Sequence, residues 1–450
     1  MAQGVYPRMC NAVQWFFIYL FMAGSAMGQS NTLVLQGAKL YPVSGTPIDR
    51  GVIVIEDGKI KAVGPEGSVA IPPNSRVENL SGKTIIPGLV DTHSHIGIYS
   101  RPSVPANADG NESSGPVQPA LRAMDAIWPA DPGIHMALAG GVTTVNIMPG
   151  SGNVVGGQTA YVKLRGRTIE EMLIPGSVGG LKMANGENPK NYGRRGQAPA
   201  TRMEEAALSR RLFVRAQEYK RKWDDYTQAK AEGKKDIKTP ERDLELEPVV
   251  EVLEQKRIVH FHTHRSDDIM TVLRLAEEFQ FRIVIQHGSG AWQVADELAR
   301  RKVPCSITLV DAPGGKLEVL DFTPERPAVL ERAGVKVAFN TDDYIISSRF
   351  LLREGGLAMR GGMTEAGALR ALTLSPAEML DLGSRVGSLE PGKDADLVVL
   401  SGPPFSVYTK VLSTFIEGEK VFDRDRPEDI RYSTGGWEVR GRYPRLGGAQ

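Results

Sequence analysis

The histidines of this chain are spaced as metal ligands often are. His93 and His95 are separated by one residue at the end of the apolar run 85–90. Side chains two residues apart in a strand point to the same face, so both imidazoles project from one strand end. Such a pair is half of a metal site, because neutral imidazole is the commonest metal ligand in proteins. Taken alone, the pair fits one buried and one exposed histidine equally well.

The positions of the other histidines favour the metal site. Six of the seven lie at or next to the ends of predicted strands, and only His135 lies in a helix-like stretch; the six are His93, His95, His260, His262, His264 and His287. Another apolar run ends in the carboxylates Asp342 and Asp343. Nitrogen and oxygen ligands of this kind suit zinc first, with manganese, iron or cobalt as alternatives. The pattern predicts a divalent metal held by several strand ends.

The elements that would position these residues alternate between short apolar runs and helical segments over residues 84–385, which is typical of a βα repeat. Eight segments have the composition of strands: 84–93, 142–148, 160–165, 178–184, 257–262, 282–287, 303–309 and 335–341. Eight parallel strands with intervening helices predict an α/β fold of the (β/α)8 TIM-barrel type. Catalytic groups of that fold lie at the carboxyl ends of the strands, where these histidines and Asp342 occur.

Both ends of the chain contain short strands and tight turns. Residues 29–83 include the step Asp57-Gly58, which is a strong hairpin signal. Residues 386–425 contain strands of the same kind around Glu417-Gly418. We predict that the two segments pair into one small β-sandwich domain beside the barrel.

A charge-rich insert of about residues 186–256 separates the fourth and fifth predicted strands. Its middle, 202–230, has an apolar side and is predicted to be one long helix. Such an insert is either a lid over the barrel mouth or a solvated surface helix. Residues 426–450 are expected to be a C-terminal tail.

Composition excludes several classes of protein. Apolar residues make up 41% and charged residues 24% of the 450-residue chain, as in a soluble globular enzyme. The formal net charge of +1 gives no reason to expect a nucleic-acid partner, and a small-molecule substrate is expected instead. A homo-oligomer is compatible with the sequence.

The first 28 residues have the features of an export signal. A basic start is followed by the apolar run 13–24 and by the small-x-small step Ala26-Met27-Gly28, where cleavage is expected. We therefore expect a protein that is exported to the periplasm or the extracellular space. After cleavage of residues 1–28 it should have no attachment to a membrane.

Lys182 lies at or near the end of the fourth predicted strand. A lysine cation is unfavourable beside metal ions, but a neutral amine that has been carboxylated becomes an anion able to bridge two of them. The alternatives are a lysine that pairs with Glu187 and a lysine that binds substrate.

Five short motifs support a family resemblance. They are Pro87-Gly88-Leu89-Val90-Asp91-Thr92-His93-Ser94-His95, Gly141-Val142-Thr143-Thr144, His287-Gly288, Thr341-Asp342 and Gly392-Lys393-Asp394-Ala395-Asp396-Leu397. Together they resemble the amidohydrolase superfamily. The segments 182–190, 198–203 and 264–269 resemble more narrowly its exported imidazolonepropionase-like amidohydrolases, and the similarity covers about residues 31–425.

The resemblance implies a distorted barrel that binds one or two divalent metals. The implied metal ligands are His93, His95, Lys182, His262, His287 and Asp342. His260, His262 and His264 share one strand face, and His262 is preferred because it ends the apolar run. Candidates for contact with substrate are His264, Arg265, Arg202 and Tyr161.

These residues predict a metal-dependent amidohydrolase that hydrolyses an amide-type C–N bond, linear, cyclic or in a dipeptide, through a metal-activated water. Asp342 is the predicted catalytic residue, which takes a proton from the water and returns it to the departing nitrogen. One alternative is a mononuclear deaminase or a cyclic C–N hydrolase of the imidazolonepropionase type. A second is a non-enzymatic binding protein on the same barrel. No Gly-x-Ser-x-Gly segment marks a serine nucleophile.

Overall fold

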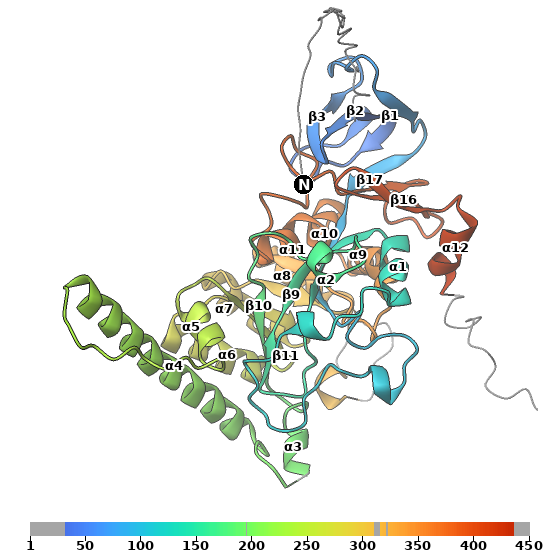
Figure 1. Ribbon diagram of the computed structural model, residues 1–450. Helices are drawn as coiled ribbons and strands as arrows, with labels where there is room; N and C mark the ends of the chain where they lie inside the picture. The colour runs from blue at the N-terminus through green and yellow to red at the C-terminus, as the bar shows by residue number, and fades with distance from the viewer. Residues whose placement is uncertain (1–31, 195, 310–315, 321–322, 436–450) are drawn as a thin grey trace, which may run out of the picture.

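The computed structural model describes residues 32–194, 196–309, 316–320 and 323–435. It has a large α/β body, a sheet built from both ends of the chain and one long helix that projects from the body (Figure 1). Within these ranges, no helix combines the length and the apolar character that a membrane span requires. The predicted signal peptide, 1–28, lies outside the described residues, as does the part of the predicted tail beyond residue 435.

One eight-stranded sheet joins the two ends of the chain. Its strands are β1 (Leu33–Leu40), β2 (Ile48–Glu56), β3 (Lys59–Pro65), β4 (Arg76–Asn79), β5 (Thr84–Pro87), β15 (Leu397–Leu400), β16 (Val411–Ile416) and β17 (Glu419–Asp423). Their order is β17-β16-β15-β5-β1-β2-β3, with β4 also paired to β1. The two ends meet where β15 runs antiparallel to β5. All eight strands belong to a single hydrogen-bonded sheet, so the predicted β-sandwich is not confirmed.

Two hairpins of this sheet have the turns that their sequences predict. Asp57 and Gly58 have φ values of 48° and 75° between the antiparallel strands β2 and β3. Glu417 and Gly418 have φ values of 50° and 78° between β16 and β17. Two consecutive positive φ angles are the mark of a type I′ turn, whose twist matches that of the flanking strands.

Each of the eight ranges predicted to contain a body strand does contain one. The strands are β6 (Leu89–Ser94), β7 (Val142–Ile147), β9 (Ala160–Lys163), β10 (Gly180–Ala184), β11 (Ile258–Thr263), β12 (Ile283–His287), β13 (Cys305–Ile307) and β14 (Val337–Phe339). From β10 to β14, chain neighbours pair in parallel. Every residue of these eight strands is buried, as expected for strands covered on both faces.

The body differs from the predicted barrel in two respects. β9 runs antiparallel to β7, and the additional strand β8 (Val155–Gln158) runs antiparallel to β10, so the strands are not all parallel. The described strands also form two sheets, β6-β7-β9 and β14-β13-β12-β11-β10-β8, rather than one closed ring. Between the two sheets, the amide of Asp342, which follows β14, donates to the carbonyl of His93 in β6 at 2.9 Å. The architecture is therefore TIM-barrel-like with mixed α/β content.

Helices follow most of these strands and cover the body. They are α1 (Pro132–Ala139), α2 (Ile169–Met172), α3 (Asn191–Arg194), α4 (Arg202–Ala231), α5 (Glu247–Leu253), α6 (Ser266–Phe279), α7 (Ala295–Arg300), α8 (Arg326–Arg332), α9 (Leu351–Arg360), α10 (Glu365–Leu372), α11 (Leu374–Met379) and α12 (Pro427–Thr434). Val272 of α6, Phe261 of β11 and Ile285 of β12 belong to one large hydrophobic cluster. This close-packed core fixes the strand ends on which the histidines lie.

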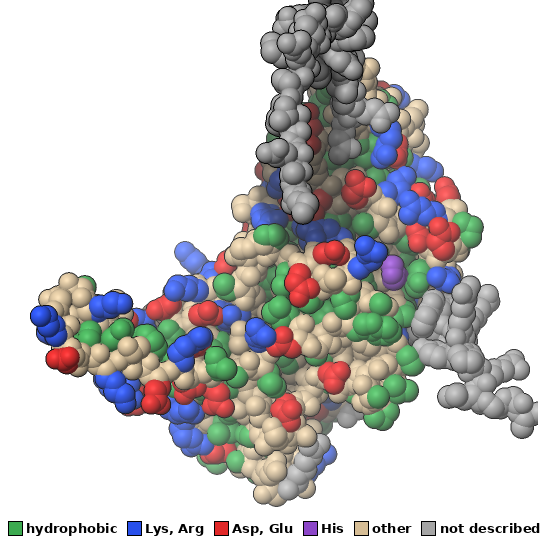
Figure 2. Space-filling model, viewed as in Figure 1, with side chains coloured by type: hydrophobic (Ala, Val, Ile, Leu, Met, Phe, Trp, Pro, Cys, Tyr) green, Lys and Arg blue, Asp and Glu red, His purple; other side chains and the backbone are tan. Residues whose placement is uncertain are grey.

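The long helix predicted in the insert is confirmed as α4. The Thr201 hydroxyl caps it by accepting a hydrogen bond from the Glu204 amide. Phe213, on its inner face, stacks on Phe279 and Phe281 with ring centres 5.0 Å and 4.7 Å away. The other end of α4 projects from the body, and side chains of both charges are interspersed along it (Figures 1 and 2). That outer part is a solvated surface helix.

A buried lysine connects the sheet of the chain ends to the body. Lys163, the last residue of β9, is 1% exposed, and its Nζ lies 2.6 Å from Asp394, 3.1 Å from Asp396 and 3.1 Å from Glu417. Burying a charge is costly unless it is paired, so the lysine and these acids depend on one another. The Gly392–Leu397 motif therefore holds the sheet against β9.

Replacing Lys163 with Met should lower the free energy of unfolding by roughly 3–5 kcal/mol, because the two buried aspartates lose the cation that they share. Urea denaturation followed by circular dichroism measures the change. Lys39, which pairs with Asp49 at the surface, provides the control, and Lys39→Met should leave the unfolding midpoint unchanged. Equal midpoints for Lys163→Met and the wild type would contradict this role.

Candidate metal centre

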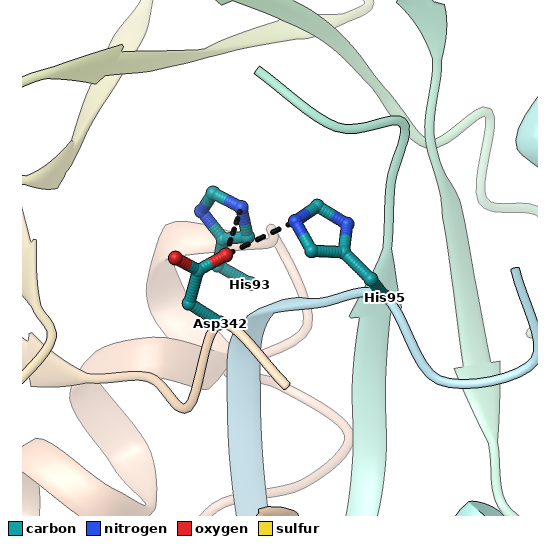
Figure 3. Close-up of side chains that lie close together, drawn as sticks. All are labelled: His93, His95 and Asp342. Carbon is teal, nitrogen blue, oxygen red and sulfur yellow. Dashed lines mark ion pairs between the residues drawn. The ribbon is translucent and has the colours of Figure 1, made fainter. Parts of the chain in front are cut away.

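Three predicted ligands meet at the carboxyl ends of β6 and β14. Figure 3 shows His93, His95 and Asp342 with their polar atoms facing one another. Nε2 of His95 lies 3.0 Å from Oδ1 of Asp342, and Nε2 of His93 lies 3.5 Å from the same oxygen. One ligand atom from each residue lies within 4.8 Å of the other two. Ligand atoms about 2 Å from a shared zinc ion are separated by similar distances, so the three residues can hold one.

Two more predicted ligands continue the cluster. The ring centre of His287 lies 4.5 Å from that of His93 and 4.5 Å from that of His262. Nδ1 of His287 lies 3.9 Å from Oδ2 of Asp342. β11 and β12 are adjacent and parallel, so their ends place these imidazoles side by side. The fold thus brings the four predicted histidine ligands and Asp342 into one cluster.

The imidazoles of His262 and His287 are each held at one nitrogen and unpaired at the other. Nδ1 of His262 lies 2.9 Å from the Ser151 hydroxyl, and Nδ1 of His287 lies 2.9 Å from the Thr308 hydroxyl. In the part of the chain that the structure describes, the buried Nε2 atoms of both rings have no hydrogen-bond partner. A metal-bound histidine usually has its second nitrogen hydrogen-bonded in this way, and an unpaired buried nitrogen is costly. The residues therefore fit a divalent metal.

Burial keeps the donor nitrogens in the form that binds metal. It lowers the pKa of His287 to about 3, although the Asp342 charge opposes the shift. Burial and the Lys182 charge hold the pKa of His93 well below its ordinary value. Burial alone raises the pKa of Asp342, but His287 and the hydrogen bond from His95 outweigh it and keep that pKa low. At neutral pH His93, His262 and His287 therefore present neutral nitrogens beside the Asp342 carboxylate, a donor set that zinc accepts.

Two of these ligands have strained backbones. His287 has a φ of 70° and Asp342 a φ of 46°, in the left-handed region that residues other than glycine rarely adopt. Such conformations cost on the order of 1–3 kcal/mol and cluster at functional sites, where the surrounding structure enforces them. The strain at both positions agrees with a functional role.

Asp91 fixes the two ligand-bearing segments to each other, a role that sequence reasoning missed. Its carboxylate accepts the His93 amide at 3.1 Å and the Thr341 hydroxyl at 2.5 Å. Burial raises its pKa to about 7 against the effect of these hydrogen bonds. The one indication of this role in the sequence was that Asp91 lies two residues before His93, within the motif 87–95. Ser151 and Thr308 were also missed, because neither lies in a motif.

The histidine His260 is excluded from the ligand set by its hydrogen bonds. Its Nε2 lies 2.7 Å from the Tyr161 hydroxyl, and its Nδ1 lies 3.1 Å from the Gln286 side-chain amide. Both nitrogens are therefore used, which favours His262 as the ligand from β11. Tyr161, predicted to contact substrate, is instead buried against His260. The seventh histidine, His135, stacks on Tyr432 of α12.

Lys182 is buried in the middle of β10 rather than at its end. Its Nζ lies 3.1 Å from Nε2 of His93 and 3.2 Å from the Pro149 carbonyl. Burial lowers the pKa of Lys182 to about 7, with Asp342 acting in the opposite direction. A large share of neutral amine is therefore present at neutral pH. The alternative pairing with Glu187 does not occur among the described ion pairs.

A cavity of about 720 Å³ lies beside the cluster. Its walls include His264, Arg265 and Arg202, three of the residues predicted to contact substrate, together with Lys190 and Trp292. The rings of His264 and His287 are 5.1 Å apart, so the cavity begins next to the ligands. This position suits a substrate that extends from the metal centre.

The two arginines of this cavity differ in their freedom to bind a ligand. Arg202 donates to Asp268 at 2.8 Å and also pairs with Glu318, so it holds α4 against the cavity wall. Among the described residues, Arg265 forms a single ion pair, an exposed one with Asp267 at 2.8 Å. Exposed ion pairs contribute little stability, so a ligand can replace this one. Arg265 is thus the better placed of the two for substrate.

Comparison with known proteins assigns the chain to a family. The Amidohydrolase family model matches residues 84–421. A solved amidohydrolase structure from Thermotoga maritima is 40% identical, covers 87% of this chain and 100% of that one, and has a TM-score of 0.82. The amidohydrolase tasK of Hapsidospora irregularis is 29% identical over 84% of this chain. The matched region spans only 39% of the length of tasK. An imidazolonepropionase of a Geobacillus species is 24% identical over 80% of this chain and 85% of that protein.

The chain belongs to the amidohydrolase family, as its motifs predicted. This membership agrees with the predicted class of enzyme, a hydrolase that acts on carbon–nitrogen bonds. It also agrees with the TIM-barrel-like body.

Substitutions at Ser151, His260 and His262 test the ligand assignment. Ser151→Ala should weaken zinc binding roughly 10- to 100-fold, because His262 loses the hydrogen bond that orients it, and His262→Ala should weaken it further. His260→Ala should retain zinc, since both nitrogens of His260 are engaged elsewhere. Competition with a chromophoric chelator measures the affinities, and thermal unfolding checks that each variant is folded. A loss of zinc from His260→Ala as large as from His262→Ala would overturn the assignment.

Proposed function

We propose that this protein is a metal-dependent amidohydrolase that cleaves the C–N bond of a small carboxylate-bearing substrate, either an N-acyl amino acid or a dipeptide. One observation supports the metal above all others. The buried Nε2 atoms of His262 and His287 have no partner within the described chain, yet they lie in the cluster that contains Asp342. A divalent cation would satisfy both nitrogens.

The proposed cofactor is one or two zinc ions. The residues that would hold them are His93, His95, His262, His287 and Asp342. Bound zinc supplies a hydrolytic nucleophile from water at neutral pH and polarises the carbonyl under attack. The chain itself provides the rest of the chemistry.

Asp342 is the proposed general base and acid. Its carboxylate is ionised at neutral pH, since its pKa is held low. It would accept a proton from the attacking water and deliver that proton to the departing nitrogen. Its left-handed backbone and the hydrogen bond from its amide to the His93 carbonyl fix the carboxylate in place for both transfers.

The charges of the cavity support a substrate with a carboxylate group. Arg265 is available once its exposed pair with Asp267 opens. Lys190 lines the same wall and forms no ion pair with any residue in the described ranges. Cations next to a hydrolytic centre would orient a carboxylate on the amine side of the scissile bond.

The second candidate is a one-metal hydrolase of a cyclic C–N bond, as in imidazolonepropionases. The hydrogen bond between Nζ of Lys182 and Nε2 of His93 favours it, because an amine in this position bridges no ions. The similarity to the Geobacillus imidazolonepropionase supports it as well. The binding-protein alternative loses support, since five predicted ligands gather in one place.

We also propose that the protein is exported and belongs to the imidazolonepropionase-like subgroup. The support is the apolar run 13–24 followed by Ala26-Met27-Gly28, together with the segments 182–190 and 198–203. The boundaries 29–83 plus 386–425 for the sheet domain and 84–385 for the catalytic domain are part of this proposal.

Removal of metal and substitution of Asp342 test the hydrolase directly. A chelator should abolish the hydrolysis of N-acyl amino acids and dipeptides, and added zinc should restore it. Asp342→Asn should lower kcat by roughly 10²- to 10⁴-fold, because proton transfer is lost while the side chain keeps its shape. Steady-state kinetics on the zinc-loaded enzyme measures the effect. The mechanism would be refuted if the wild type kept full activity in the presence of chelator, or if the Asp342→Asn variant were fully active.

Whether Lys182 is carboxylated distinguishes a two-metal site from a one-metal site. The neutral amine that burial favours can react with carbon dioxide, so the two-metal form should carry a carbamate. After incubation with ¹³C-bicarbonate, the wild type should give a carbamate signal in its ¹³C spectrum, and Lys182→Ala should not. Lys39→Ala, which removes a surface lysine paired with Asp49, should retain the signal. Absence of the signal from fully active wild type would favour the one-metal hydrolase.

A further inference from the structure

Two tyrosines form an aromatic surface beside the metal centre. Tyr99 lies in the segment after β6, and Tyr344 follows Asp342 by two residues. Their ring centres are 5.1 Å apart with an interplanar angle of 79°. Tyr99 also meets His95, with ring centres 5.6 Å apart at 83°. Edge-to-face contacts of this kind are favourable for aromatic rings, so the surface continues directly from a metal ligand.

The Tyr99 ring is held in a fixed position. Its hydroxyl accepts a hydrogen bond from the Asn111 side-chain amide, whose oxygen accepts the Gly152 amide at 2.7 Å. Gly110 packs against the ring so closely that a Cβ there would lie 2.1 Å from its Cε2 atom. An aromatic ring that is already ordered loses little conformational entropy when a ligand binds to it.

Tyr344 exposes the outer part of this surface. It is 61% exposed, and the adjacent Ile345 is 48% exposed. Single apolar side chains at a protein surface are ordinary. These two, however, lie two and three residues after the proposed catalytic Asp342, and Tyr344 contacts a ring that contacts His95. Apolar surface in such a place is suited to a ligand.

A series of ring contacts connects this surface to the cavity. Successive contacts connect Tyr344, Tyr99, His95, His93, His287 and His264. The tyrosines are at one end of this series, and His264, on the cavity wall, is at the other. A bond cleaved at the ligands between them would have its two substituents on different sides.

We propose that Tyr99 and Tyr344 are specificity-determining residues that bind an aromatic or other flat apolar group on the acyl side of the scissile bond. This inference rests on the proposed function, in which the cavity with Arg265 takes the carboxylate on the amine side. The preferred substrates are therefore N-arylacyl amino acids, or dipeptides with an aromatic first residue.

Kinetics with two substrates that differ only in the acyl group test the aromatic surface. On the zinc-loaded enzyme, kcat/KM for an N-phenylacetyl amino acid should exceed that for the N-acetyl derivative. Tyr344→Ala should lower this ratio by roughly tenfold, and Tyr344→Phe should preserve it, because the ring makes the contact. Tyr408→Ala removes a tyrosine that is 87% exposed between β15 and β16, and should leave the ratio unchanged. Gly110→Ala, which displaces the Tyr99 ring, should lower the ratio as Tyr344→Ala does.

Calorimetric titration with phenylacetate and acetate provides a second readout. Wild type should bind phenylacetate more tightly than acetate, and Tyr344→Ala should remove the difference. If the enzyme hydrolyses neither substrate, the proposed function is overturned, but the titration still tests the aromatic surface. An unchanged ratio in Tyr344→Ala, or equal binding of the two acids by wild type, would overturn the aromatic surface and leave the hydrolase standing.

Discussion

Desolvation of imidazoles around one carboxylate is the constraint on which this structure depends. His93, His95, His262 and His287 are all buried, and the Nε2 atoms of the last two have no hydrogen-bond partner in the described chain. A buried polar atom without a hydrogen-bond partner destabilises the folded state. A metal ion can offset this cost, because it replaces water as the partner of the buried nitrogen. The same burial keeps His93, His262 and His287 neutral by lowering their pKa values, and a neutral ring is the form that coordinates metal.

The surroundings of the ligands hold them in this unfavourable arrangement. Asp91 connects the amide of His93 to the hydroxyl of Thr341 and so fixes β6 to the segment that follows β14. Ser151 and Thr308 orient two of the rings from loops that belong to other strands. The hydrogen bonds of neighbouring segments thus offset the backbone strain at His287 and Asp342. A site built in this way is pre-organised before substrate arrives.

Charged residues have two different tasks in this molecule. Lys163 with Asp394 and Asp396, and Arg202 with Asp268, are used to join parts of the fold. Such residues are poor candidates for binding substrate, because a substrate would have to compete with a buried partner. The ion-pair partner of Arg265 in the described ranges, Asp267, is exposed, so Arg265 can exchange it for a ligand. Charged residues whose ion-pair partner is buried therefore have a structural role, whereas those whose partner is exposed can bind a ligand.

The sequence by itself determined the strand positions, the ligand types and the family, because alternation along a strand and short motifs are local properties of the chain. Only the tertiary structure decided that both nitrogens of His260 are hydrogen-bonded, to Tyr161 and Gln286, which makes His262 the better candidate for binding metal. It also decided that β9 runs antiparallel to β7 and that Lys182 lies within β10. These outcomes depend on contacts between residues far apart in the chain, and no local pattern specifies which distant partner a side chain or a strand will meet.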